Sequence, residues 1–335
     1  MMQYKPLGNS GLMVSELCLG SMIFGEENER GTSPQDAQQL IHAYLDAGGN
    51  HIDTANVYAS GKSERIIGKA LKGKRGQVVL ATKVRFPMGE GANEQGLSRV
   101  HIQDSVEASL KRLDTEVIDL LYMHCWDPIT PIEESLRAFE DLVRAGKVRY
   151  IGVSNFKAWQ LMKSLALSDT NQWARYIAAQ YQYSLLERNI EDEISSLCEA
   201  EGVSLVPWGP LGGGFLSGKY QPGDKPESGR LAIMPEETEE SWERRNSERN
   251  WNILAAVDEL AQSKGATQAQ IALAWVMAQP AVRSTIMGVR TMAQLEANLT
   301  ATEITLSPEE LGRLDQASKP QERYPYRFIE KYGSR

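Results

Sequence analysis

The stretch His51-Ile-Asp-Thr-Ala-Asn-Val-Tyr-Ala-Ser-Gly-Lys-Ser-Glu64 decides the fold. It begins as the end of a buried strand. It ends as the start of a helix, which Ser63 is predicted to cap and whose apolar residues recur at helical spacing through Leu71. An acid, Asp53, and a phenol, Tyr58, lie between the strand and the helix. In barrels of alternating strands and helices, this strand-to-helix turn belongs to the active face.

Two later strands end in the same way. Residues 77–83 form a β-rich run that ends at Lys83, and residues 117–124 form another that ends at His124. Taken singly, such residues are usually turn, surface or core residues. Four of them at matching positions after three successive strands favour a common site at one face.

The rest of the chain also alternates between predicted strands and helices. A hairpin is predicted around Gly8-Asn-Ser-Gly11, followed by a first barrel strand over 16–20. Eight strand–helix units at this spacing predict an α/β fold, a (β/α)8 TIM barrel forming a single domain over 1–335. The alternative, a doubly wound sheet, needs a Gly-rich fingerprint that residues 20–25 lack. Strands are expected to end near Asp53, Lys83, His124, Ser154, Gln182, Pro207 and Gly288, with helices over 35–47, 64–72, 100–113, 131–145, 157–168, 189–201, 251–264, 267–278 and 308–317.

The connection after the seventh strand is unusually long, running from Trp208 to Arg283. Residues 209–230 are rich in Gly, Pro and Ser, and residues 234–249 are highly charged. A long segment at the active face of a barrel is usually a lid or binding loop. The alternative is that residues 222–247 are a mobile insertion without a role.

Composition excludes several function classes. The formal net charge of -8 argues against a nucleic-acid surface. Cys18, Cys125 and Cys198 lie far apart, which favours reduced thiols. The N-terminus lacks a secretion signal and no apolar run reaches membrane-spanning length, so a cytoplasmic protein without membrane contact is expected. His, Cys and carboxylates show no metal-ligand spacing, so no metal is expected.

Asp53, Tyr58, Lys83 and His124 resemble the catalytic tetrad of the aldo-keto reductase family. The resemblance covers nearly the whole chain, and its motifs are specific as a set. They are Gly152-Val-Ser-Asn-Phe156, Gln180-Tyr-Gln182, Pro207-Trp-Gly-Pro-Leu-Gly-Gly-Gly214, Leu216-Ser-Gly-Lys-Tyr220 and Gly288-Val-Arg-Thr-Met-Ala-Gln-Leu-Glu-Ala-Asn298.

The resemblance implies a role for each of the four. Tyr58 would be the general acid that protonates a carbonyl oxygen as a hydride reaches the carbon. Lys83 would lower the pKa of that phenol, because an ammonium stabilises tyrosinate. Asp53 would hold Lys83, and His124 would donate a hydrogen bond to the carbonyl oxygen or help relay the proton.

It also implies the hydride donor, a nicotinamide dinucleotide that in this family is usually NADPH. The carboxamide would be held by Ser154, Asn155 and Gln180, and the ring would stack on Trp208. Arg290 would bind the 2′-phosphate, since a guanidinium fork at a helix start suits phosphate. The remaining cofactor residues would be Gly20, Pro210, Leu211, Gly213, Lys219, Gly288, Gln294 and Asn298, and the substrate pocket would use Met22, Phe24, Phe86, Trp126, residues 209–247 and the C-terminal tail.

These expectations define an NADP(H)-dependent oxidoreductase that reduces an aldehyde, ketone or sugar carbonyl reversibly. Its partner would be a small-molecule carbonyl or alcohol substrate. The alternative is a cofactor-binding regulatory subunit of the same fold with little turnover. A metal-dependent barrel hydrolase or lyase lacks ligands.

Overall fold

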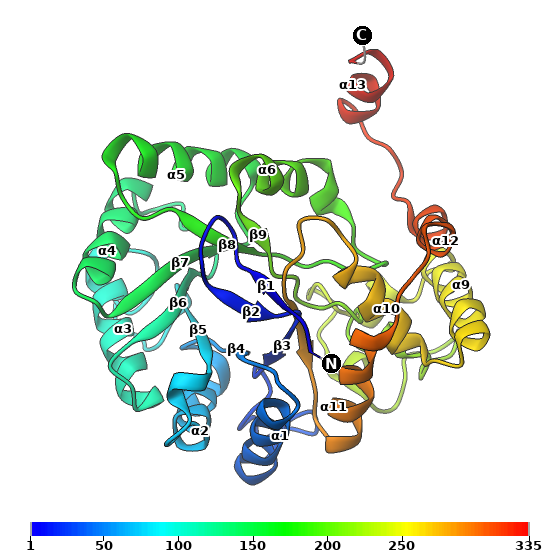
Figure 1. Cartoon of the computed structure of the whole chain (residues 1–335), viewed down its shortest axis with the longest axis horizontal. Helices are drawn as coiled ribbons and strands as arrows, with labels where there is room; N and C mark the ends of the chain where they lie inside the picture. Colours follow the sequence, from blue (N-terminus) through cyan, green and yellow to red (C-terminus); the bar gives the residue numbers. More distant parts are fainter. Residues whose placement is uncertain (1, 334–335) are drawn as a thin grey trace.

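A computed structural model describes residues 2–333 (Figure 1). The strands are β1 (Tyr4–Pro6), β2 (Met13–Ser15), β3 (Leu17–Gly20), β4 (His51–Asp53), β5 (Val79–Val84), β6 (Ile118–Met123), β7 (Val148–Ser154), β8 (Tyr176–Gln180), β9 (Ser204–Leu205) and β10 (Thr285–Gly288). The helices are α1 (Pro34–Asp46), α2 (Lys62–Ala70), α3 (Arg99–Leu113), α4 (Ile132–Arg144), α5 (Ala158–Asn171), α6 (Ile194–Glu201), α7 (Arg230–Ile233), α8 (Trp242–Arg245), α9 (Glu248–Lys264), α10 (Gln268–Met277), α11 (Met292–Leu299), α12 (Pro308–Ser318) and α13 (Tyr326–Tyr332).

The eight strands from β3 to β10 form one parallel sheet that curls into a barrel. Its order is β10-β3-β4-β5-β6-β7-β8-β9, so neighbours in space are neighbours in the chain except where β10 returns to β3. Three backbone hydrogen bonds join β9 and the residues after it to the chain around β10. They run from Leu205 N to Ala281 O at 2.8 Å, from Arg283 N to Leu205 O at 3.1 Å and from Ile286 N to Pro207 O at 2.9 Å. The predicted (β/α)8 barrel is therefore confirmed.

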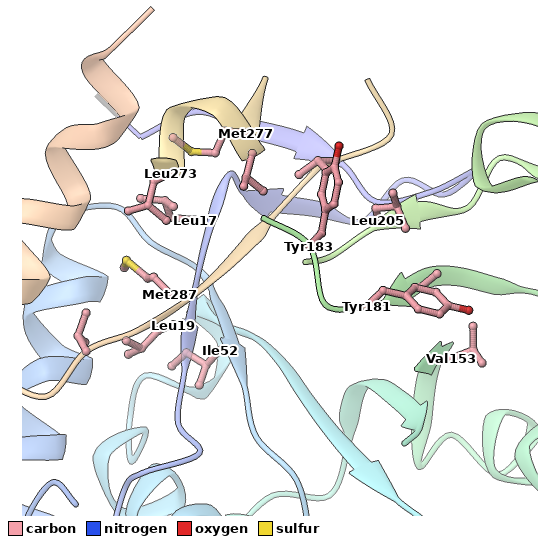
Figure 2. Packing of buried hydrophobic residues seen from close by; sticks show 14 of the residues in the cluster. Leu17, Leu19, Ile52, Val153, Tyr181, Tyr183, Leu205, Leu273, Met277 and Met287 are labelled. Carbon is pink, nitrogen blue, oxygen red and sulfur yellow. The ribbon is translucent and has the colours of Figure 1, made fainter. Parts of the chain in front are cut away.

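Side chains alternate between the two faces of the sheet. On β3, Leu17 and Leu19 belong to the large outer core, whereas Cys18 between them belongs to the smaller cluster inside the barrel. Figure 2 shows Leu17 beside Leu273 of α10, with Met287 of β10 close by. The helices thus cover the outer face of the barrel, and every second residue of a strand points inward.

The hairpin of β1 and β2 closes one end of the barrel and is confirmed as predicted. Its strands pair from Tyr4 with Ser15 to Pro6 with Met13. Leu7 and Val14 are fully buried in the inner cluster. Gly8 has a φ of +58°, and a Cβ there would lie 2.2 Å from Ile177 O, so the turn requires glycine.

One predicted helix cap is wrong. Ser63 does not cap α2, which begins at Lys62 after the left-handed Gly61. Ser63 Oγ instead lies 2.9 Å from Thr54 Oγ1 and 2.8 Å from Ser21 Oγ. Local sequence suggested a cap, but three buried hydroxyl groups from separate segments satisfy one another here. The predicted helix over 189–201 is also shorter, since its first part is a 3-10 turn over Asn189–Asp192.

The segment after β9 is folded onto the barrel. It contains α7 and α8, and Trp242 packs edge-on against Tyr220 and Trp251. The C-terminal tail behaves differently, because α13 stands away from the barrel at the end of an extended stretch (Figure 1). No described residue beyond 319 lines the large cavity, so the expected contribution of the tail to the substrate pocket is wrong. No helix within residues 2–333 has the length and apolarity needed to cross a membrane.

Candidate active site

Several of the predicted site residues meet because they lie at the carboxyl ends of neighbouring strands. Gly20 pairs with Asp53, Lys83 with Tyr122, and Ser154 with Gln180. A cavity of about 1550 Å³ opens at this end of the barrel. Asp53, Tyr58 and His124 line it, and Lys83 lies directly beneath with 1% exposure.

Lys83 is the centre of the constellation. Its ammonium donates to Asp53 Oδ1 at 2.5 Å, to Thr54 O at 2.8 Å and to Tyr58 Oη at 3.1 Å. An ammonium has three hydrogens, so every donor of Lys83 is used. The side chain is therefore fixed between a carboxylate on one strand and a phenol on the following turn.

Tyr58 reaches the cavity through an unusual turn. The 3-10 segment over Tyr58–Gly61 contains Ala59 at φ 46° and Ser60 at φ 53°, followed by Gly61 at φ 83°. Left-handed conformation costs a non-glycine residue roughly 1 kcal/mol, so surrounding contacts must hold it. The hydroxyl of Ser63 supplies such contacts from the first turn of α2, through its bonds to Thr54 and Ser21.

Burial and charge act in opposite directions on these groups. Burial would lower the pKa of Lys83, but Asp53 and Tyr58 outweigh it, and the pKa lies above its usual value. Burial also dominates at Tyr58, whose pKa is raised although Lys83 acts to lower it. The predicted lowering by Lys83 is thus present, but the net direction is opposite.

His124 lies at the end of β6 beside the same phenol. Its ring is edge-on to Tyr58 with centroids 5.9 Å apart, and edge-on to Phe86 at 4.7 Å. Burial holds its pKa well below the usual range, with further lowering from Lys83 and Arg85. Nδ1 is buried without a hydrogen-bond partner among residues 2–333. A neutral imidazole can still donate one hydrogen bond to a ligand oxygen.

Three polar residues form the opposite rim. Ser154 Oγ donates to Gln180 O at 2.8 Å, and Asn155 Nδ2 donates to Ser154 Oγ at 2.9 Å and to His124 O at 3.0 Å. Asn155 has a φ of 56°, a conformation that asparagine tolerates better than most residues. Gln180 Nε2 donates to Asp53 Oδ2 at 2.9 Å across the barrel.

The remaining cavity wall is long and suits an extended polar ligand. Gly212, Gly213 and Gly214 are all left-handed, and such turns expose backbone N–H groups to anions. Arg290 Nη1 donates to Glu29 O at 2.7 Å, and Arg290 lies just before the N-terminus of α11. All the residues expected to contact the cofactor line this cavity, namely Gly20, Ser154, Asn155, Gln180, Trp208, Pro210, Leu211, Gly213, Lys219, Gly288, Arg290, Gln294 and Asn298.

Two of the four residues expected at the substrate pocket lie elsewhere. Met22 and Phe86 line the cavity, but Phe24 is 0% exposed in the outer core and Trp126 packs edge-on against Phe156 and Trp159 outside it. For Phe24 the cause is a turn: its N–H bonds Ser21 O and directs the ring into the core. The residues that take these places in the wall include Ile23, Val57 and Pro87.

Of two arginines in the cavity wall, Arg30 was not predicted, whereas Arg230 lies within residues 209–247, which were expected there. Arg30 binds Glu26 through two nitrogens and contacts Met234 Sδ at 3.3 Å, which joins the loop after β3 to the segment after β9. Arg230 forms an ion pair with the buried Glu240. The signal available in the sequence was the long polar connection over 25–33 at the active face.

Residues 2–333 contain no group of three or more His, Cys, Asp or Glu side chains arranged to hold a metal ion. The cavity instead combines a phenol, an ammonium, a carboxylate and an imidazole on a (β/α)8 barrel. A large cavity at the carboxyl ends of the strands is where enzymes with a (β/α)8 barrel bind small molecules, so the fold and the cavity are those of a barrel enzyme.

Comparison with known proteins agrees with this class. The model of the aldo/keto reductase family matches residues 16–319, and the chain belongs to that family. It is 40% identical to the uncharacterized oxidoreductase YrpG of Bacillus subtilis (strain 168), over 94% of this chain and 95% of that protein. It is 35% identical to versiconal hemiacetal acetate reductase of Aspergillus parasiticus, over 97% and 99% of the two chains.

A third relative is named for a different role. The chain is 35% identical to the probable voltage-gated potassium channel subunit beta of Arabidopsis thaliana, over 97% of this chain and 100% of that protein. The family match and the reductases among the relatives make this chain an oxidoreductase. Members of the family typically use a nicotinamide cofactor.

Proposed function

We propose that the protein is an NADP(H)-dependent carbonyl reductase, acting reversibly on an aldehyde, ketone or sugar, with Tyr58 as the general acid. The observation that carries the proposal is the placement of Lys83 Nζ between Asp53 Oδ1 at 2.5 Å and Tyr58 Oη at 3.1 Å. This arrangement gives a phenol both a proton to donate and a cation to stabilise the phenolate that remains.

The cofactor would lie along the cavity with its nicotinamide end at the rim of Ser154, Asn155 and Gln180. Trp208 would pack against the ring, and Arg290 would contact the adenosine end. When bound in this way, a reduced nicotinamide supplies the hydride for the reaction. Arg290 is the residue that supports NADPH over NADH, because a guanidinium binds the extra phosphate with two parallel hydrogen bonds.

The side chains of this protein would then supply the proton that the carbonyl oxygen takes up. Reduction places negative charge on the carbonyl oxygen, and Tyr58 Oη transfers its proton there. The raised pKa of Tyr58, which results from burial, keeps the proton in place until that charge develops. The neutral imidazole of His124 would donate a hydrogen bond to the same oxygen, which stabilises charge as it forms. Alcohol oxidation would use the phenolate of Tyr58 as the base.

The test is a turnover measurement with purified protein, NADPH and a panel of aromatic, aliphatic and sugar aldehydes. Loss of NADPH absorbance that depends on the aldehyde supports the proposal. Tight binding of NADPH without turnover on any carbonyl would contradict it. That result would favour the second candidate, a cofactor-binding regulatory subunit, which is suggested by the relative named as a potassium channel beta subunit.

A further inference from the structure

One hydrogen bond spans the mouth of the barrel. Gln180 Nε2 at the end of β8 lies 2.9 Å from Asp53 Oδ2 at the end of β4. In the closed sheet, β5, β6 and β7 separate these strands on one side, and β3, β10 and β9 separate them on the other. The two residues therefore stand on opposite walls, and each is 3% exposed.

The two oxygens of Asp53 have separate partners. Oδ1 accepts from Lys83 and Oδ2 accepts from Gln180. A carboxylate accepts hydrogen bonds only, so the amide of Gln180 must turn its NH2 group toward Asp53. With both oxygens bonded, the carboxylate plane cannot rotate without losing a charge-assisted hydrogen bond.

The orientation of the Asp53 carboxylate affects the position of Lys83 relative to the Tyr58 phenol. Lys83 has no unused donor, because its ammonium contacts Asp53, Thr54 O and Tyr58 together. If Asp53 turned, Lys83 would follow it or lose its ion pair. Either change would move the ammonium relative to Tyr58 Oη.

We propose that Gln180 is a positioning residue for the proton donor: it holds Asp53 from the opposite wall, so that Asp53 fixes Lys83 against Tyr58. This inference rests on the proposed function, and it gives Gln180 a role that differs from its expected contact with the cofactor carboxamide. The side chain of Gln180 would then link the cavity wall expected to bind the cofactor with the series Asp53, Lys83 and Tyr58.

The experiment compares wild type with Gln180→Leu, Gln180→Glu and the matched control Gln182→Leu. Gln182 lies two residues further along the chain, does not line the cavity, and its amide nitrogen has no hydrogen-bond partner among residues 2–333. The measurements are kcat for reduction at saturating NADPH between pH 5 and 8, and the Kd of NADPH for each variant.

Gln180→Leu should lower kcat by about ten- to a hundredfold, the range expected for loss of a hydrogen bond to a charged group. Gln182→Leu should stay close to wild type. In Gln180→Glu the new carboxyl group faces Asp53, and this like charge raises its pKa. Its protonated form can donate to Asp53 Oδ2, so kcat of this variant should recover as the pH falls, while the Leu variant stays low at every pH.

Two outcomes would overturn the inference. One is a Gln180→Leu variant with weakened NADPH binding but wild-type kcat, since Gln180 would then serve the cofactor alone. The other is a Gln180→Glu variant whose kcat relative to wild type does not change with pH. Absence of turnover in the wild type would instead contradict the proposed function, so the two failures are distinguishable.

Discussion

Lys83 contacts Tyr58 in two ways at once: its Nζ lies 3.1 Å from the phenolic oxygen and 4.8 Å from the centroid of the ring. The ammonium therefore stabilises a phenolate and also restrains the ring. Because Lys83 is 1% exposed, little water screens this interaction. Removing the hydroxyl oxygen of Tyr58 or the charge of Lys83 should therefore have the largest effect on the reaction rate.

Tyr58→Phe removes the donated proton and keeps the ring. We expect the rate of carbonyl reduction to fall by 10²-fold or more, as is typical when a general acid is lost. Cofactor binding should persist, and quenching of the fluorescence of Trp208 in the cavity wall offers a way to measure it. Near-normal turnover of this variant would exclude Tyr58 as the acid.

Lys83→Met keeps the length of the side chain and removes its charge. Reduction should slow as much as in Tyr58→Phe, because the phenolate would lose its stabilising cation. Among residues 2–333, the buried carboxylate of Asp53 would then keep only Gln180 as a side-chain partner, so the variant should unfold at lower denaturant concentration. If kcat were retained and only the Kd of the cofactor increased, Lys83 would be a binding residue.

Arg290→Ala should weaken the binding of NADPH much more than the binding of NADH. A hydrogen bond to a charged group contributes roughly 1.5–3 kcal/mol, so NADPH should bind about ten- to a hundredfold more weakly. NADH lacks the 2′-phosphate and should change little. Arg283→Ala is the matched control, because Arg283 bonds the backbone of Val282 and does not line the cavity. Equal weakening of both cofactors would mean that Arg290 serves only to hold the loop at Glu29.

From the buried environment of His51 we expect the free energy of unfolding to fall in mild acid. Its Nδ1 lies 2.8 Å from Ser284 Oγ, which itself donates to Ser15 O, so His51 is the donor and Nε2 carries no proton. Nε2 has no partner among residues 2–333, and burial, with a further contribution from Lys83, lowers the pKa of His51 to about 3.

The folded state thus favours neutral His51, so acid, which protonates the imidazole, should lower the free energy of unfolding. Its contribution to stability is complete above the unfolded pKa of roughly 6.5 and is lost progressively as the pH falls toward 3. At pH 5 the loss should be roughly 2 kcal/mol. Denaturant unfolding between pH 7 and 5 measures it. His51→Gln, which cannot titrate, should show a shallower pH dependence; parallel curves would refute the assignment.

The sequence by itself determined the barrel and most of the site. Strands such as β5 and β6 are short apolar runs along which side chains alternate between the two faces. Val84 and Met123 belong to the outer core, so their neighbours Lys83 and His124 face the inside of the barrel. Asp53, Lys83 and His124 could therefore be placed at one face from their position in the chain. The thirteen residues expected to contact the cofactor also line one cavity, because they lie at the carboxyl ends of strands, on the loop after β9 or at the start of α11.

Only the tertiary structure decided the contacts that join opposite walls and distant segments. The bond from Gln180 to Asp53 crosses 127 residues of sequence, and the hydroxyl group of Ser63 was satisfied by Thr54 and Ser21 rather than by a helix end. The net rise in the pKa of Tyr58 likewise depends on burial, which is a property of the whole fold. Periodicity along the chain reports which face a residue occupies, but desolvation and cross-barrel distances arise only when the sheet closes.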